Sequence, residues 1–461
     1  MADAKKVTLD DIVALAKRRG FVYQSSDIYG GLANLYDYGP VGTALLRNIK
    51  NLWWKTFVEQ REDIVGLDAS LISHAKIWEA SGHVAGFADA MVDCKTCHFR
   101  TRADHLIEDF LEKHNKSEKV EGKTMDELNA IIVREKIPCP KCGSSNWTPP
   151  RKFNLLFPVK LGILEESQSL AYLRGETAQG MFINFKNVLD STRVRLPFGI
   201  AQQGKSFRNE ITKGNFVFRT LEFELSEIEY FFNPEETKWE ELFEAWKKDL
   251  WKFVTGVLGV EKDHLRWRPH TDEERSFYSK RTEDLEYEFP FGFKELWGLA
   301  YRTDYDLTQQ MKGSGADLQY LDPKSGKKFT PHVIEPAVGM NRLFLMVLAD
   351  AYWFDEEKNR VVLKLNKNLA PYRAAVFPLL PNKPELVAKA KEIYAMLKLD
   401  APIAWDDRGN IGKRYMAQDE IGTPSAITVD FQTLEDNTVT VRDRDTAMQK
   451  RVKIDELKGM L

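Results

Sequence analysis

The chain has 461 residues, 43% of them hydrophobic and 29% charged, which is the length of about three domains and enough for a large core. Its 66 Lys and Arg against 69 Asp and Glu give a net charge of −3, which excludes a protein that coats nucleic acid through bulk positive charge. The sequence indicates no low-complexity disorder, signal peptide or membrane span, so we expect a cytoplasmic protein without a membrane partner.

The first predicted element is a short helix over 8–20, where Thr8 is a suitable N-cap and Gly20 a stop. A turn-rich stretch over 25–42 follows. Apolar residues at helical spacing then predict a long amphipathic helix over 43–61.

All four cysteines lie in two CxxC pairs, Cys94/Cys97 and Cys139/Cys142, which flank a charged, helical stretch over 103–136. Four thiolates complete a tetrahedral zinc shell and leave no open position for chemistry, so this pattern predicts a structural zinc site that closes an insertion over 88–150. Two alternatives stay open. Cys94-Lys95-Thr96-Cys97-His98 also matches a haem c attachment signature, and all four cysteines could be inert core residues.

Strand patterns dominate the next part of the chain, at 196–202, 216–232, 285–293, 298–305 and 329–338, with a surface helix over 235–262 between them. An apolar helix at 340–354 ends this region, and a boundary is expected at 366–372. Beyond it, strands at 374–379, 403–405, 425–429 and 438–442 and helices at 383–397 and 411–418 predict a small α/β domain.

Common catalytic signatures are missing: the chain has no GxxxxGK[ST] loop, no GxGxxG after a strand, no GxSxG and no HExxH. Three arginine–carboxylate segments remain. Arg208 and Glu210 precede a loop, Ile211-Thr212-Lys213-Gly214-Asn215, that returns through Arg219 and Phe223. The other two segments are Glu335–Arg342 and Arg174–Gly180.

Each segment has a functional and a structural interpretation. Arginine forks and an aromatic face suit a nucleotide, and an arginine at the start of an apolar helix suits an anion. Taken alone, the first two segments are more often ion pairs, and Glu176-Thr177-Ala178-Gln179-Gly180 is more often a capped helix start.

In order along nearly the whole chain, these segments resemble class II aminoacyl-tRNA synthetases, and most closely the glycyl-tRNA synthetase family of the homodimeric type. The resemblance also rests on eight further segments: Tyr29-Gly30-Gly31, Asp37-Tyr38-Gly39-Pro40, Arg102-Ala103-Asp104-His105, Phe153-Asn154-Leu155-Leu156-Phe157, Phe207-Arg208-Asn209-Glu210-Ile211, Arg302-Thr303-Asp304-Tyr305-Asp306-Leu307, Gly409-Asn410-Ile411-Gly412-Lys413 and Val441-Arg442-Asp443-Arg444-Asp445-Thr446.

The resemblance implies an α+β fold: an antiparallel-sheet catalytic domain over 1–366 that carries the 88–150 insertion, and an anticodon-binding domain over 367–461. Motif 1 would be 43–72 at the dimer interface, although the usual proline at its strand end is missing. Motif 2 would be 199–232 and motif 3 would be 335–348.

The implied reaction joins glycine to ATP as glycyl-adenylate and then transfers glycine to tRNA(Gly), with Mg²⁺ as a cofactor. By analogy with the family, Arg208 would hold the α-phosphate and Arg342 the outer phosphate. Glu210 would orient ATP, Phe223 would stack on adenine, and Glu295 would bind ATP and Mg²⁺. The remaining ATP-binding residues would be Asn209, Phe218, Arg219, Leu296 and Gly339. We expect Arg208, Glu210 and Arg342 to be the catalytic residues, acting by positioning and electrostatics rather than by proton transfer.

Glycine has no side chain, so its pocket must exclude larger amino acids by volume and hold the ammonium with acidic groups. Glu176 and Glu227 are the candidates for the ammonium, with Arg102 near the substrate. The same analogy places Phe223, Glu224, Glu335, Ala337 and Gly339 at glycine.

Three positions depart from the family pattern: Gly175 stands where proline is usual, Ala337 where serine is usual, and Phe223-Glu224-Leu225-Ser226-Glu227 where FEQME is usual. All three fall at the amino-acid pocket. Two alternative functions therefore stay open: a non-catalytic, nucleic-acid-binding relative of the synthetases, and an enzyme that activates another small amino acid.

Overall fold

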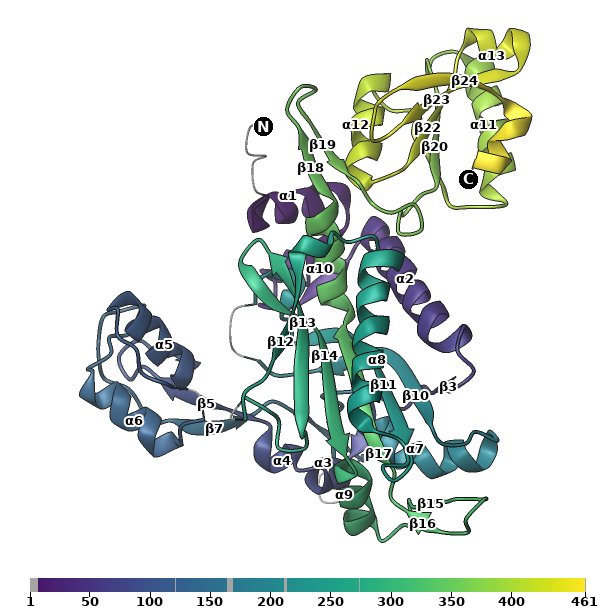
Figure 1. Cartoon of the computed structure of the whole chain (residues 1–461). Coiled ribbons are helices and arrows are strands. Elements are labelled where there is room, and N and C mark those ends of the chain that lie inside the picture. The colour runs from purple at the N-terminus through teal and green to yellow at the C-terminus, as the bar shows by residue number, and fades with distance from the viewer. Residues whose placement is uncertain (1–6, 121, 164–168, 211–213, 273, 461) are drawn as a thin grey trace.

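The computed structural model describes residues 7–120, 122–163, 169–210, 214–272 and 274–460 (Figure 1). A seven-stranded sheet in the order β12-β13-β14-β17-β11-β10-β3 forms its centre, and every neighbouring pair is antiparallel except β10 with β3. The strands are β3 (Ile64–Gly66), β10 (Phe198–Phe207), β11 (Glu222–Phe232), β12 (Leu265–Pro269), β13 (Arg281–Phe289), β14 (Gly292–Thr303) and β17 (His332–Gly339).

The strand predictions need three corrections. β10 runs on to Phe207 and β11 begins only at Glu222, because Phe216–Phe218 forms a turn of 3₁₀ helix. The predicted strand at 285–293 is the end of β13, a tight turn, and the start of β14, since the chain reverses between Phe289 and Gly292. β12 was not predicted. It is an edge strand whose charged side chains hide the alternation.

Three helices cover one face of the sheet: α2 (Pro40–Trp54), α8 (Trp239–Lys252) and α10 (Met340–Ala351). A fourth helix, α1 (Leu9–Arg19), joins the same apolar core from beside them. α1 begins and ends as predicted, with a capping box between Thr8 and Asp11 and a left-handed Gly20. α2 begins at Pro40, before the predicted start, because a proline in the first turn gives up no hydrogen bond. The stretch predicted at 235–262 is α8, a π-helical turn and a 3₁₀ turn, and it buries Phe243, Trp246 and Leu250.

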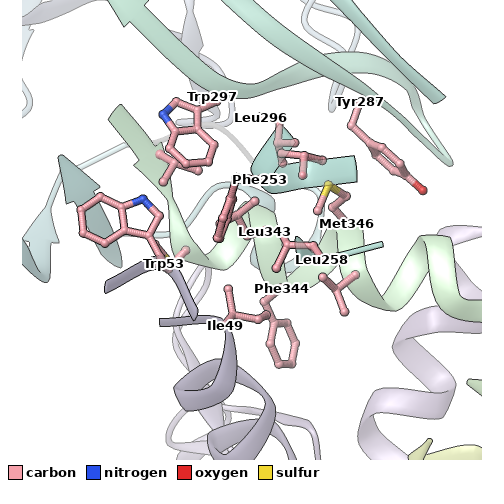
Figure 2. Packing of buried hydrophobic residues seen from close by; sticks show 14 of the residues in the cluster. Ile49, Trp53, Phe253, Leu258, Tyr287, Leu296, Trp297, Leu343, Phe344 and Met346 are labelled. Carbon is pink, nitrogen blue, oxygen red and sulfur yellow. The ribbon is translucent and has the colours of Figure 1, made fainter. Parts of the chain in front are cut away.

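The core between these helices and the sheet is built from large side chains (Figure 2). Trp53 of α2, Trp297 of β14 and Leu343 of α10 are fully buried and meet around Phe253. Burial of aromatic surface on this scale fixes α2 and α10 against the back of the sheet. The opposite face is covered at one end by α7 (Ala178–Ser191) and α9 (Tyr305–Ser314), and the rest of it lines the site described below.

The insertion projects from the body of the molecule on β5 (Ala88–Asp93) and β7 (Arg151–Asn154) (Figure 1). It has its own apolar cluster, and its helical part is two helices, α5 (Ala103–Lys113) and α6 (Met125–Arg134), rather than one stretch. Its third strand is β6 (Arg100–Arg102).

Smaller elements join these parts. β4 (Ile72–His74), β8 (Phe157–Leu161) and β9 (Ser169–Leu173) form a three-stranded sheet, and α3 (Ala75–Ala80) and α4 (His83–Gly86) lead from it to the insertion. Two short hairpins complete this part: β1 (Val22–Gln24) with β2 (Tyr36–Tyr38), and β15 (Tyr320–Leu321) with β16 (Lys328–Phe329).

The C-terminal unit is a five-stranded sheet in the order β21-β20-β22-β23-β24. Its elements are β20 (Ala374–Pro378), α11 (Pro384–Lys398), β21 (Ile403–Trp405), α12 (Ile411–Ile421), β22 (Ser425–Val429), α13 (Phe431–Asp436), β23 (Thr438–Asp443) and β24 (Gln449–Lys453). α13 and β24 were not predicted. β20 lies parallel to β21 and β22, as the alternation of strands and helices requires.

A hairpin of β18 (Tyr352–Asp355) and β19 (Arg360–Leu363), where we expected the last turn of the 340–354 helix, reaches the C-terminal unit (Figure 1). Buried Arg360 contacts Asp355 at 3.1 Å and Asp419 of α12 at 2.5 Å. Arg442 of β23 contacts the same Asp419 through both of its terminal nitrogens, at 2.8 and 3.0 Å. We call these four residues the interdomain clamp.

Candidate active site

The open face of the sheet carries the candidate site, and strand periodicity explains which residues reach it. Successive side chains of a strand point to opposite faces, so Ile228 and Tyr230 of β11 enter the core while Leu225 and Glu227 face the other way. Cross-strand pairing places Glu227 beside Ala337 of β17. The resulting cavity encloses about 290 Å³.

One end of the cavity is built around Arg208. Its Nε donates to the carbonyl oxygen of Gly175 at 3.0 Å, and its guanidinium carbon lies 5.0 Å from the ring centre of Phe87 and 5.4 Å from that of Phe223. One backbone acceptor and two aromatic rings therefore fix the side chain, and its remaining N–H groups can serve an anion.

A second arginine lies at the same end. Arg342, in the first turn of α10, contacts the Glu295 carboxylate at 2.8 Å and lies 4.4 Å from the ring centre of Phe218. Arg219 pairs with Glu210 at 3.0 Å. The two ion pairs that the structural interpretation predicted are therefore present, and both lie in the wall of the cavity.

The other end of the cavity has a floor of buried carboxylates around one guanidinium. Arg302 of β14, 1% exposed, contacts Asp306 at 2.8 and 2.9 Å and Glu335 at 2.9 Å, and it lies 3.9 Å from Glu176. Glu227 accepts hydrogen bonds from the backbone N–H of Thr177, at 2.7 Å, and from its hydroxyl.

Charge is distributed unevenly among these carboxylates. Burial acts to raise the pKa of Glu176, but the facing His83 and Arg302 outweigh it and hold the pKa well below its usual range. Burial raises the pKa of Glu335 to about 8, with Arg302 opposing and Glu227 and Glu176 adding to the shift. Burial and repulsion by Glu176 also raise the pKa of Glu227. The floor therefore combines a carboxylate that loses its proton easily, Glu176, with two carboxyl groups that hold their protons more tightly, Glu227 and Glu335.

Glu229, two residues further along β11, is fully buried, and neither of its carboxylate oxygens has a hydrogen-bond partner among the described residues. Burial, followed by repulsion from Glu335, raises its pKa well above the ordinary value. The raised pKa favours the neutral, protonated form of this carboxyl group, which can donate a hydrogen bond.

The structure brings most of the predicted site residues into this one cavity. Those that line it are Glu176, Arg208, Glu210, Phe218, Arg219, Phe223, Glu227, Glu295, Glu335, Ala337, Gly339 and Arg342. Ile211, Thr212 and Lys213 of the loop expected beside them lie outside the described residues.

Four predicted residues do not line the cavity. Leu296 faces the core together with Trp297, because the register between β13 and β14 shifts at this point. Glu224 faces away because its neighbours in β11 face the site, and it forms an ion pair with Lys50. Asn209 donates its backbone N–H to Leu155. Arg102 is held by Asp89 at 3.0 Å and Asp104 at 2.5 Å at the base of the insertion, although it still lies within the field of Glu210.

Sequence reasoning gave no role to several residues of the site. Arg302 is the centre of the floor, Tyr278 covers it, and His270 lines the wall with its Nε2 2.8 Å from Asp284. Glu229 carried a usable signal, since it interrupts the apolar run 228–232 at the end of β11. Tyr278 and His270 lie in a connecting loop and gave no comparable signal.

The four cysteines meet beyond the paired ends of β5 and β7, next to the bridge between Cys94 and Trp147, rather than where the insertion joins the body. Their sulfur atoms all lie within 4.8 Å of one another, with Cys94 Sγ 3.6 Å from Cys142 Sγ and Cys97 Sγ 3.7 Å from Cys139 Sγ. A tetrahedron with metal–sulfur bonds of about 2.3 Å has edges of about 3.8 Å, so the donor set fits Zn²⁺. Gly143 adopts φ +75°, a conformation that glycine allows in the tight turn after the second pair.

Comparison with known families agrees with this geometry. Residues 161–351 match the "tRNA synthetase class II core domain (G, H, P, S and T)", and residues 373–461 match the "Anticodon binding domain". The antiparallel sheet with its arginine and carboxylate ends is thus the core of a class II aminoacyl-tRNA synthetase.

Further matches identify the family within this class. Residues 114–155 match the "Glycyl-tRNA synthetase insertion domain 1". The chain is 51% identical over 457 residues to a glycine–tRNA ligase of Clostridium tetani, which covers 98% of this chain and 97% of the relative. It is 50% identical over 465 residues to one of Geobacillus thermodenitrificans, which covers 100% of this chain and 98% of the relative. The chain belongs to the glycine–tRNA ligase family.

Proposed function

We propose that this chain attaches glycine to tRNA(Gly) in an ATP-dependent reaction, through a glycyl-adenylate formed in the cavity. The observation that carries the proposal is one cavity with two fixed arginines at one end and buried carboxylates at the other, in a member of the glycine–tRNA ligase family. Such a cavity matches the two substrates: a polyphosphate at the arginine end and an ammonium group at the carboxylate end.

At the arginine end, Arg208 would hold the α-phosphate of ATP and Arg342 the outer phosphate. Phe223 would stack on adenine, and Glu210, held by Arg219, would orient the nucleotide. Phe218, Gly339 and Glu295 complete this wall, while Asn209 and Leu296 would support it from behind.

In the first step, a carboxylate oxygen of glycine forms a bond to the α-phosphorus while the bond to the bridging oxygen breaks. Pyrophosphate leaves with that electron pair, and no proton is transferred. Arg208 is already held by Gly175, Phe87 and Phe223, so its charge meets the developing charge on phosphorus without reorganisation.

At the carboxylate end, Glu176, Glu227 and Glu335 would hold the ammonium of glycine, while Ala337 and Gly339 form the wall beside it. Arg102 and Glu224 would act from outside the cavity, through Glu210 and through the backbone of β11. Glycine would be selected by volume, because a larger side chain must displace well-packed, ion-paired groups.

Two metal ions fit the residues present. Asp284 and Glu295 face a common point, since a Cβ built on Gly298 lies 3.9 Å from Asp284 Oδ1 and 3.8 Å from Glu295 Oε1. These carboxylates would hold Mg²⁺, which neutralises phosphate charge when bound. Zn²⁺ would be held by Cys94, Cys97, Cys139 and Cys142 and would have a structural role.

The second step, transfer of glycine to the tRNA 3′ end, requires the C-terminal unit. We propose that 367–461 binds the anticodon arm, that 1–366 holds both reaction steps, and that 88–150 is a separately folded insertion. Because ribosomes use the product, we also propose that the enzyme acts in the cytoplasm. Within the described residues no helix is long and apolar enough to cross a membrane.

We propose a homodimer with its interface on the β4–β9–β8 sheet, next to motif 1. Leu71, Ile72, Leu161 and Leu170 are each 40–47% exposed on this sheet or beside it. Apolar residues gathered in this way mark protein–protein contacts more often than free surface. Sedimentation analysis tests it: a Leu170→Glu variant should shift the dimer toward monomer.

The test of the function is ATP–pyrophosphate exchange with glycine, alanine or serine, and with Arg208→Ala as the control variant. We expect exchange with glycine alone and its loss in the variant. Exchange with alanine or serine would show that Gly175 and Ala337 have changed the pocket. No exchange with any amino acid, together with retained tRNA binding, would indicate a non-catalytic relative.

A further inference from the structure

His83 is a buried histidine behind the carboxylate floor that the reaction described above does not use. It begins α4, is 3% exposed, and places its Nε2 3.2 Å from the Oε2 atom of Glu176. Its other ring nitrogen, Nδ1, lies 2.8 Å from the hydroxyl oxygen of Ser81, which is fully buried. Ser81, His83 and Glu176 thus form a chain that ends at the cavity.

The direction of these hydrogen bonds follows from the acceptor at the end of the chain. An ionised carboxylate only accepts, so Nε2 must carry a hydrogen and donate it to Glu176. In the neutral ring Nδ1 is then an acceptor, and the Ser81 hydroxyl, whose other acceptor is the Trp78 carbonyl oxygen at 3.3 Å, can donate to it. Because a hydroxyl can also accept, the carboxylate of Glu176 selects the ring form and Ser81 is compatible with it.

Packing leaves the imidazole little freedom to turn. The ring centres of Trp78 and Phe87 lie 5.3 and 5.5 Å from that of His83. The preceding residue, Gly82, has φ +86°, and a Cβ built on it would lie 3.2 Å from the ring of Phe277. Only glycine fits this turn without strain, and the turn fixes where α4 begins.

Each of the two carboxylate oxygens of Glu176 therefore has its own partner. Oε2 accepts from His83, while Oε1 lies 3.2 Å from Gln179 Nε2 and 3.9 Å from Arg302. We propose that His83 is a positioning residue of the amino-acid site, which aims the Glu176 carboxylate at the substrate ammonium. This inference rests on the function proposed above for the same cavity.

The same short helix also supports the phosphate end. Phe87, the residue after α4, packs against the guanidinium of Arg208 at 5.0 Å. The insertion starts at the next residue with β5. The turn that leads into the insertion therefore contacts residues at both ends of the cavity. Phe87 contacts Arg208 at the phosphate end, and His83 contacts Glu176 at the glycine end.

The test is glycine-dependent ATP–pyrophosphate exchange by the full chain, with KM measured for glycine and for ATP. We expect His83→Ala to raise KM for glycine about 10- to 100-fold, the range for one hydrogen bond to a charged group, and to leave KM for ATP within about twofold. His83→Gln, whose side-chain amide can donate in place of Nε2, should recover most of the loss.

The matched control is His264→Ala. His264 also pairs with a carboxylate, Asp350, at 2.8 Å, but it lies away from the cavity, so both KM values should stay unchanged. An unchanged KM for glycine in His83→Ala would overturn the inference, as would an equal loss for both substrates without recovery in His83→Gln. A wild-type chain that shows no glycine-dependent exchange would instead overturn the proposed function.

Discussion

The ring of Tyr278 covers the guanidinium of Arg302, with its centre 3.9 Å from the guanidinium carbon. The arginine is thus closed off on one face while its edges contact Asp306 and Glu335. A planar, fully buried cation can serve this many acceptors only because its donors are arranged as a rigid fork.

Arg302→Lys should therefore destabilise the protein strongly, although the substitution keeps the positive charge. We expect a loss of about 3–5 kcal/mol in the free energy of unfolding, because one ammonium cannot satisfy carboxylates that stay buried. Thermal denaturation checks this. Arg281→Lys is the control. Arg281 pairs with Glu244 and Glu283 but is about one-third exposed, so this substitution should lower the free energy of unfolding by less than about 1 kcal/mol.

Glycine binding should depend on pH in the neutral range. The pKa of Glu335 is raised to about 8, so at lower pH this group is protonated and must release its proton before it can face an ammonium as a carboxylate. KM for glycine should fall as the pH rises from about 6 to about 8, by at most about tenfold per pH unit. KM for ATP is the internal control, and a KM for glycine that stays flat or rises over this range would contradict the assignment.

The cysteine cluster should matter more for tRNA than for the adenylate. Cys139→Ser removes one of four sulfurs and should loosen the insertion, whose apolar cluster includes both Cys139 and Cys94. We expect a larger loss of tRNA charging than of ATP–pyrophosphate exchange, together with loss of bound zinc in metal analysis. Equal losses in the two assays would count against a local structural role.

The interdomain clamp should separate the two reaction steps. Asp419→Asn leaves Arg360 and Arg442 without the carboxylate that joins them, so the C-terminal unit should lose its fixed orientation. We expect kcat/KM for tRNA to fall at least about tenfold, while exchange, which needs only the cavity, stays within about twofold. Asp400→Asn, which breaks the half-exposed Lys458 pair of the same unit, should change neither activity.

Local signals in the sequence predicted the parts of the fold that local physics decides. Thr8 and Gly20 bound α1 as expected, because caps and left-handed ends are encoded within a few residues. The reversal after Phe289 was missed because the turn at Pro290 and Phe291 lies inside a hydrophobic run.

The sequence predicted only part of the cavity. Its carboxylates come from segments that are distant in sequence, and only the resemblance to a family linked Glu176 with Glu227. The contact of Glu335 with Arg302 depends on the register between β14 and β17, which one sequence does not reveal. His83 gave no signal, because its role depends on a single contact across the fold.

The contact between α1 and Glu420 constrains the order in which the molecule is completed. Arg18 and Arg19 both pair with this residue, which follows Arg18 by 402 positions. At about 5–20 residues per second of synthesis, the two arginines wait about 20–80 s for their partner. α1, which is synthesised long before α12, is therefore among the last helices to be fully anchored, and the nascent chain carries an exposed basic helix end until the C-terminal unit has folded.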